Sequence, residues 1–577
     1  MQSPATPLAG QPVRLVVVAE REASGGRLRV WGPGGEQPAT LMQRGGPPFW
    51  WLATIERPRV GRHRYVLVEP GGRVLACGRF RVLRRKPTSP PSTQPVDYWP
   101  NARHWNRVEE NLYSAWIEKL FDAPPDQRPS WTPLHVVFHD PARNLLYNHL
   151  GFNEDGPEVS DAIVVQPDCA DLPHFLRAYF AWKRRLPFGY RHCSRGSSTK
   201  PPRCGELKTN VGQLVPVAGD RRLQTPAQLF SHFLRKKVSN VHSASGRTAA
   251  NDDATDLYPV ALSRRSLRPG TVYIDPYGHL LVVSRWIAQA EGTSGLLFAA
   301  DAHPDLSVGR KRFWRGAFMF LDDYRGGAGG FKAFRPIVER DGQLVALTNE
   351  EIRKESGYRN YATSQYDLGL DGFYLKMDEV INPRALGPLQ AYRERLKALH
   401  ELIGERVDSV QAGEDHMKKS AYRTIEMPSG PRIFETRGPW EDFSTPARDM
   451  RLLIAIEDVL RYPDLVIKMP KRFALAAGEN PSQARQKMLQ LAQTFMDKHG
   501  IHYVASDGSK RRLSIKQIVE RRKELEMAYN PNDCVELRWG ASGDELRTCK
   551  RNAPADQRQR MLQYRAWFAS RTRPPIR

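Results

Sequence analysis

The stretch that decides the fold runs from residue 270 to residue 283 and reads GTVYIDPYGHLLVV. Two apolar runs, 272–274 and 280–283, flank the sequence Asp-Pro-Tyr-Gly. Proline and glycine in such a segment favour a tight turn, so the pattern predicts a strand, a turn and a second strand. His279 then begins the second strand, at one end of a sheet.

A further apolar run, residues 296–300, ends at Asp301. If this run pairs with the strand after His279 as an antiparallel neighbour, the start of one strand lies beside the end of the other. His279 and Asp301 would then meet as a base and the carboxylate that orients it. His303 and Asp305 are close alternatives for this third position.

Residues 167–182, PDCADLPHFLRAYFAW, contain apolar side chains at helical spacing. Asp168 is a natural N-cap, so Cys169 is expected to open a buried helix. The helix dipole and free backbone N–H groups there favour a thiolate and could stabilise a tetrahedral oxyanion. Pro173 removes a donor near the first turn. Either the helix bends there, or it begins nearer Asp171 and leaves Cys169 just before it.

Together these residues predict a nucleophile, a base and an orienting carboxylate in Cys169, His279 and Asp301. The competing interpretation is structural, because a cysteine at a buried helix start often serves as a small apolar residue. No cofactor and no metal ion are expected. His135 and His139 are four residues apart, but their segment is predicted to be a strand, which argues against a metal site there.

The Asp-Cys helix start and the segment 270–283 resemble those of the papain-like thiol hydrolases. The pattern GTVY…GHL resembles the NlpC-type cell-wall peptidases, and the helix that follows Cys169 is similar to that of bacterial transglutaminase-like domains. The resemblance covers roughly residues 131–320. It implies an α+β papain-like fold and acyl transfer from an amide, with a cell-wall peptide as substrate. The 110 residues from Cys169 to His279 exceed the usual spacing and require insertions.

We expect a multidomain chain. Residues 12–86 contain short strand-like runs separated by Gly/Pro turns, which indicates an immunoglobulin-like β-sandwich. Residues 87–97 are rich in proline and read as a linker. The papain-like α+β catalytic domain is expected at 98–340, and a mainly α-helical basic region at 345–577.

The composition narrows the class of protein. The 577 residues are 40% hydrophobic, which suffices for buried cores, and the net charge is +24. No apolar run is long enough to span a membrane, and the first residues show no signal peptide. The basic charge favours an anionic partner such as a cell envelope, whereas nucleic-acid recognition motifs are absent.

Four cysteines form two pairs that are close in sequence, Cys193 with Cys204 and Cys534 with Cys549. Two short disulfides would place the protein in an oxidising compartment, periplasmic or extracellular, whereas scattered free thiols would fit the cytosol.

From the predicted Cys169, His279 and Asp301 site and the resemblance, we expect a thiol-dependent amide hydrolase or transamidase acting on peptides. The alternative is a binding protein that keeps this fold without turnover and docks on an anionic envelope.

Overall fold

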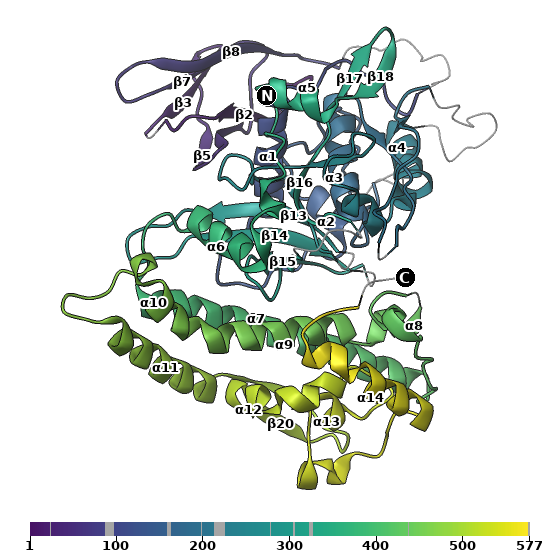
Figure 1. Ribbon diagram of the computed structural model, residues 1–577. Coiled ribbons are helices and arrows are strands. Elements are labelled where there is room, and N and C mark those ends of the chain that lie inside the picture. The colour runs from purple at the N-terminus through teal and green to yellow at the C-terminus, as the bar shows by residue number, and fades with distance from the viewer. Residues whose placement is uncertain are drawn as a thin grey trace.

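The computed structural model describes residues 1–23, 25–86, 97–157, 163–197, 199–212, 225–276, 279–303, 306–321, 327–436 and 438–574. Figure 1 shows N-terminal sheets at the top, a central sheet with its helices in the middle, and a group of helices at the bottom. The protein therefore combines several antiparallel sheets with a helical C-terminal part, as the sequence predicts. Of the predicted linker at 87–97, all but Asp97 lies outside the described residues.

Two four-stranded antiparallel sheets form the N-terminal part, in the orders β1-β2-β6-β5 and β4-β3-β7-β8. Alternate side chains of β2 and β6, such as Leu15 and Trp51, share one core with Leu28 and Phe80 of the second sheet. Trp50 points the opposite way and packs against α1 (Arg107–Leu120). The strands are β1 (Gln2–Ser3), β2 (Val13–Ala19), β3 (Arg27–Gly32), β4 (Gly35–Glu36), β5 (Thr40–Arg44), β6 (Phe49–Ile55), β7 (Gly61–Val68) and β8 (Val74–Val82).

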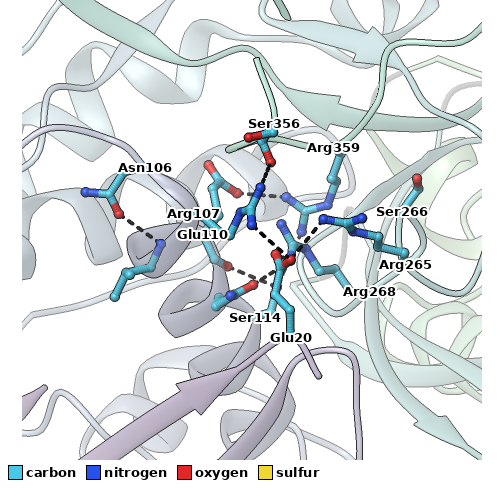
Figure 2. A network of polar contacts seen from close by, with 12 residues as sticks. Glu20, Asn106, Arg107, Glu110, Ser114, Arg265, Ser266, Arg268, Ser356 and Arg359 are labelled. Carbon is cyan, nitrogen blue, oxygen red and sulfur yellow. Dashed lines mark hydrogen bonds and ion pairs between the residues drawn. The ribbon is translucent and has the colours of Figure 1, made fainter. Parts of the chain in front are cut away.

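Ion pairs join the N-terminal sheets and α1 to segments far along the chain. Glu20, which follows β2, lies 2.9 Å from Arg265 and 3.5 Å from Arg268. Glu110 of α1 (Arg107–Leu120) pairs with Arg359 at 2.7 Å. Figure 2 shows these carboxylates and guanidinium groups converging from separate elements, so the network ties distant segments together.

The central sheet has six antiparallel strands in the order β11-β16-β12-β13-β14-β15. Side chains alternate between the two faces along each strand, and different helices pack on each face. Val282 and Ala300 face α1 and α3 (Asp171–Arg184), whereas Leu281 and Ala299 face the core shared with the C-terminal helices. The strands are β11 (Leu257–Pro259), β12 (Val272–Ile274), β13 (Leu280–Ile287), β14 (Leu296–Ala302), β15 (Val308–Arg312) and β16 (Gly330–Phe334).

One local prediction is wrong. Residues 134–139, expected as a strand, form the short helix α2 (Leu134–Phe138). Leu134, Val137 and Phe138 are buried in the core beneath α1 and α3, and this burial selects the helix over the intrinsic strand preference of Val and Phe. The helix brings the His135 and His139 rings to 5.6 Å, and His139 Nε2 lies 3.1 Å from the Ile163 carbonyl oxygen. Short segments that complete this region are β9 (Gly189–Tyr190), β10 (Lys208–Thr209) and α4 (Pro226–Lys236).

The C-terminal part is mainly helical and packs below the central sheet (Figure 1). Arg406 of α7 and Asp449 of α9 form a buried two-point contact at 2.7 and 2.9 Å. The helices are α5 (Asn349–Lys354), α6 (Gly369–Ile381), α7 (Pro388–Lys419), α8 (Pro439–Phe443), α9 (Pro446–Arg461), α10 (Leu465–Lys468), α11 (Pro481–Lys498), α12 (Ile515–Glu520), α13 (Val535–Arg538) and α14 (Ala555–Ala569). Two hairpins accompany them, β17 (Ile337–Arg340) with β18 (Gln343–Ala346) and β19 (Gly500–Val504) with β20 (Lys510–Ser514).

Both predicted disulfides are present, Cys193–Cys204 and Cys534–Cys549. Cys77 and Cys169 remain outside disulfides. Among the described residues, no helix has the length and apolar character needed to cross a membrane.

Candidate functional site

Cys169 lies in the turn that leads into α3. The helix begins at Asp171, which is the second of the two arrangements that the sequence left open. Asp168 Oδ1 accepts hydrogen bonds from the backbone N–H groups of Ala170 at 2.8 Å and Asp171 at 3.0 Å. Pro173 occupies the third helical position, where the N–H has no partner inside the helix in any case, so it does not bend the helix.

This capping reduces the number of backbone N–H groups at the helix start that could stabilise an oxyanion. We expected free N–H groups beside Cys169 to stabilise an oxyanion, but the carboxylate of Asp168 already occupies two of them. A cap of this kind stabilises the helix and at the same time places a negative charge next to the thiol. These two N–H groups are therefore not available to an oxyanion while Asp168 caps the helix.

His279 and Asp301 meet at one end of the central sheet, as their sequence positions predict. Strands β13 and β14 pair antiparallel with Leu281 opposite Asp301, so residue 279 falls opposite residue 303. His279 precedes β13 by one residue, and its backbone oxygen accepts a hydrogen bond from Asp275 N at 2.8 Å. The distance from His279 Nδ1 to Asp301 Oδ1 is 3.5 Å. Asp301 lies inside β14, which continues to Ala302.

Cys169 joins the same end of the sheet through its backbone. Its carbonyl oxygen accepts a hydrogen bond from Leu280 N at 3.3 Å, and Leu280 directly follows His279. The structure thus brings the segments of all three predicted residues together, although Cys169 precedes His279 by 110 positions in the chain.

His303 is also part of this group. Its Nε2 atom lies 3.3 Å from Asp301 Oδ2, and its ring centroid is 5.5 Å from that of His279. Asp301 therefore presents one carboxylate oxygen to each imidazole. Asp305, the other alternative that the sequence offered, lies outside the described residues.

The electrostatic environment of Cys169 opposes ionisation. Burial raises the pKa of the Cys169 thiol well above its ordinary value. Nearby carboxylates raise this pKa further, and they belong to Asp168, Asp301, Glu441 and Glu435. The resting residue is therefore a protonated thiol, in contrast to the thiolate that a helix start by itself favours.

The neighbouring groups keep Asp301 charged. Burial alone would raise the pKa of Asp301, but His303, His279 and Lys311 outweigh burial and hold it well below its usual range. Burial lowers the pKa of His303 to about 3, although the charge of Asp301 opposes this shift. A buried carboxylate that stays ionised between two imidazoles can orient both rings.

The C-terminal helices contribute groups that the local sequence did not reveal. Glu441 of α8 adds a carboxylate near His279 and Cys169, and burial raises the pKa of Glu441. Arg451 of α9 pairs with the buried Asp275 at 2.7 Å, which attaches the helix to the turn before His279. These residues lie more than 130 positions beyond the sheet segments they approach, and no motif marks them.

A cleft of about 470 Å³ opens beside His303, between β15 and α7. Lys311 and Arg312 line it from the sheet, and Glu401 and Glu405 from the helix. Most of these charges are paired across the cleft, for example Arg312 with Glu401 at 2.9 Å. The cleft therefore leads from the surface to the imidazole of His303 between two charged walls.

Comparisons of this chain with protein-family models, with curated proteins and with solved structures found no match.

Proposed function

We propose that this protein is a thiol-dependent amide-bond hydrolase or transamidase that acts on peptides. In this proposal, residues 98–340 are a papain-like α+β domain and the N-terminal sheets are an immunoglobulin-like β-sandwich. The observation that carries the proposal is the pairing of β13 with β14, which sets His279 Nδ1 3.5 Å from the buried carboxylate of Asp301. Cys169 is hydrogen-bonded to the residue that follows His279.

The chemistry assigns one step to each residue. Asp301 holds His279 by Nδ1, which leaves Nε2 as the nitrogen that takes the proton from the Cys169 thiol. The thiolate attacks the amide carbonyl, and the imidazolium returns the proton to the departing amine. Water then releases the acyl group from the thioester, or an amine takes it in a transamidation.

The raised pKa of Cys169 sets a condition on this mechanism, because the thiol must lose its proton at the moment of attack rather than beforehand. The same observation favours the alternative, a binding protein that keeps the fold without turnover. Two disulfides fit a periplasmic or extracellular location, and the net charge of +24 fits an anionic surface in either case. A cell-wall peptide is the substrate we propose.

One experiment separates the enzyme from the binding protein. The rate of iodoacetamide modification is measured against pH with Cys77→Ser protein, so that Cys169 is the one thiol outside a disulfide. Because the resting thiol is protonated, modification well below pH 8 requires His279 to take the proton during the reaction. The enzyme therefore predicts such modification and its loss in a His279→Gln variant. Modification confined to alkaline pH and indifferent to His279 would support the binding protein instead.

Turnover is tested on isolated cell-wall fragments by the appearance of new amino groups. Cys169→Ala should abolish the release, and Cys77→Ser should leave it unchanged, because Cys77 lies in β8 of the N-terminal sheets. Release that persists in Cys169→Ala would refute the thiol mechanism.

A further inference from the structure

The cluster of His279, Asp301 and His303 has the composition of a metal site. One nitrogen from each imidazole and a carboxylate oxygen all lie within 4.8 Å of one another. The three residues come from two neighbouring strand ends, and the antiparallel register places residue 279 opposite residue 303. Imidazole nitrogen and carboxylate oxygen are ligands that Zn²⁺ commonly takes.

The two contacts between imidazole nitrogen and carboxylate oxygen have lengths that ligands of one ion also show. Two ligand atoms at about 2.0–2.2 Å from Zn²⁺ and at the tetrahedral angle lie roughly 3.3–3.6 Å apart. The observed separations are 3.5 Å from His279 Nδ1 to Asp301 Oδ1 and 3.3 Å from His303 Nε2 to Asp301 Oδ2, so each imidazole approaches a different oxygen of the carboxylate. A normal N–H···O bond is about 2.9 Å long, so both contacts exceed it.

Two of these atoms are also left without a hydrogen bond. Asp301 Oδ1 and His279 Nδ1 are both buried, and neither makes a hydrogen bond to any residue that the structure describes. The side chain of Asp301 is 2% exposed, so water does not solvate this carboxylate freely. Buried polar atoms of this kind normally have a partner, and these two lie 3.5 Å apart.

The nearby cations do not take the place of the missing partner. Lys311 bonds to Glu405 of α7, which holds its ammonium 4.0 Å from Asp301 Oδ2. His303 lines the cleft between β15 and α7, so an ion bound here would have a route to solvent and an open coordination position. Three protein ligands with an open position are the arrangement of catalytic rather than structural zinc sites.

We propose that His279, Asp301 and His303 bind one divalent transition-metal ion of the Zn²⁺ type. This inference does not rest on the proposed function. If both hold, the bound ion and the thiol reaction exclude each other, because a His279 Nδ1 atom that coordinates the ion carries no proton for the hydrogen bond to Asp301 that the thiol mechanism requires. The ion would then act as an inhibitor of the thiol reaction.

The test is equilibrium dialysis of the full-length protein against Zn²⁺ alone, without reductant. The absence of reductant keeps Cys534 and Cys549 in their disulfide, so that the neighbouring group with Glu536 offers no thiolate to the metal. We expect one Zn²⁺ per chain. His303→Gln should weaken binding by more than about 100-fold, since the loss of outer partners of a ligand alone weakens metal binding by about 10–100-fold.

Two control variants separate this site from others. Cys169→Ala should keep the Zn²⁺ while removing the thiol reaction, so failure of the proposed function and failure of this inference give different results. His139→Gln should also keep the Zn²⁺, because the His135–His139 pair of α2 is a separate imidazole pair. Less than about one fifth of an equivalent bound by the wild type, or unchanged binding by His303→Gln, would overturn the proposal.

A second measurement on the unaltered protein covers the case in which the variants fail to fold. Zn²⁺ that binds the folded chain raises the midpoint of thermal unfolding with ligand concentration. We expect such a rise with Zn²⁺ and not with Mg²⁺, which prefers oxygen ligands. The absence of a rise with Zn²⁺ would refute the site without recourse to any variant.

Discussion

Replacing Glu118 by Gln should stabilise the protein at alkaline pH. Glu118 lies in α1, and its carboxylate accepts a hydrogen bond of 2.7 Å from Trp50 Nε1 of the N-terminal sheets. Burial raises its pKa from 4.5 to about 7, because the hydrogen bond from Trp50 and the charges of nearby arginines only partly offset the loss of solvation. The folded protein therefore holds a proton on Glu118 that the unfolded chain releases.

The sign and size of the effect follow from this difference. The unfolded chain ionises Glu118 above its ordinary pKa of 4.5, and the folded protein ionises it only near 7, so stability falls as the pH rises between these values. The full loss is about 3 kcal/mol, and about 2–3 kcal/mol of it falls between pH 5 and pH 9. Glutamine does not ionise in either state, and its amide oxygen can still accept from Trp50.

The assay is urea unfolding followed by tryptophan fluorescence at pH 5 and at pH 9. The wild type is compared with Glu118→Gln at each pH, because this double difference cancels every other titrating group. Relative to the wild type, the variant should gain about 2–3 kcal/mol on going from pH 5 to pH 9.

The matched control is Glu109→Gln in the same helix. Glu109 accepts two hydrogen bonds from Arg184, at 3.0 and 2.7 Å, and both side chains are buried. Removing this charge leaves Arg184 without its partner and should destabilise the protein at both pH values by about 3–5 kcal/mol. The reasoning fails if Glu118→Gln shows no dependence on pH, or if it is less stable relative to the wild type at pH 9 than at pH 5.

Three further outcomes are expected. Asp301→Asn should lower turnover by about one to four orders of magnitude, because the orienting charge is lost, and steady-state kinetics on the peptide substrate would show it; unchanged turnover would make Asp301 a structural residue. Glu110→Gln should destabilise the fold by about 3–5 kcal/mol in urea unfolding at pH 7, since burial of Glu110 is outweighed by Arg177 and Arg359, which hold its pKa at about 2. That stabilisation is present above pH 4.5 and is lost as the pH falls towards 2, so the variant should be less sensitive to acid over this range, and an equal sensitivity would contradict the assignment. Peptide mapping without reductant should recover Cys193–Cys204 as a linked pair from protein taken from its native location, whereas free thiols there would argue against an oxidising compartment.

The sequence by itself determined the elements that depend on local signals. The turn residues between 274 and 280 and the apolar runs on either side specify β12 and β13, because turn preference and a short apolar run both act within a few residues. The same holds for α3, whose apolar face recurs at helical spacing. The meeting of His279 with Asp301 was predictable as well, since antiparallel pairing of consecutive strands sets the register.

Tertiary structure decided the secondary structure of residues 134–139 and the protonation of Cys169. Residues 134–139 became a helix because their buried side chains fit beneath α1 and α3, which local preference does not encode. The Cys169 thiol was expected to ionise, yet burial and the carboxylates of Asp168, Asp301, Glu441 and Glu435 keep its proton in place. Desolvation and long-range charge depend on which segments pack together, and Glu435 and Glu441 come from a part of the chain more than 260 positions away.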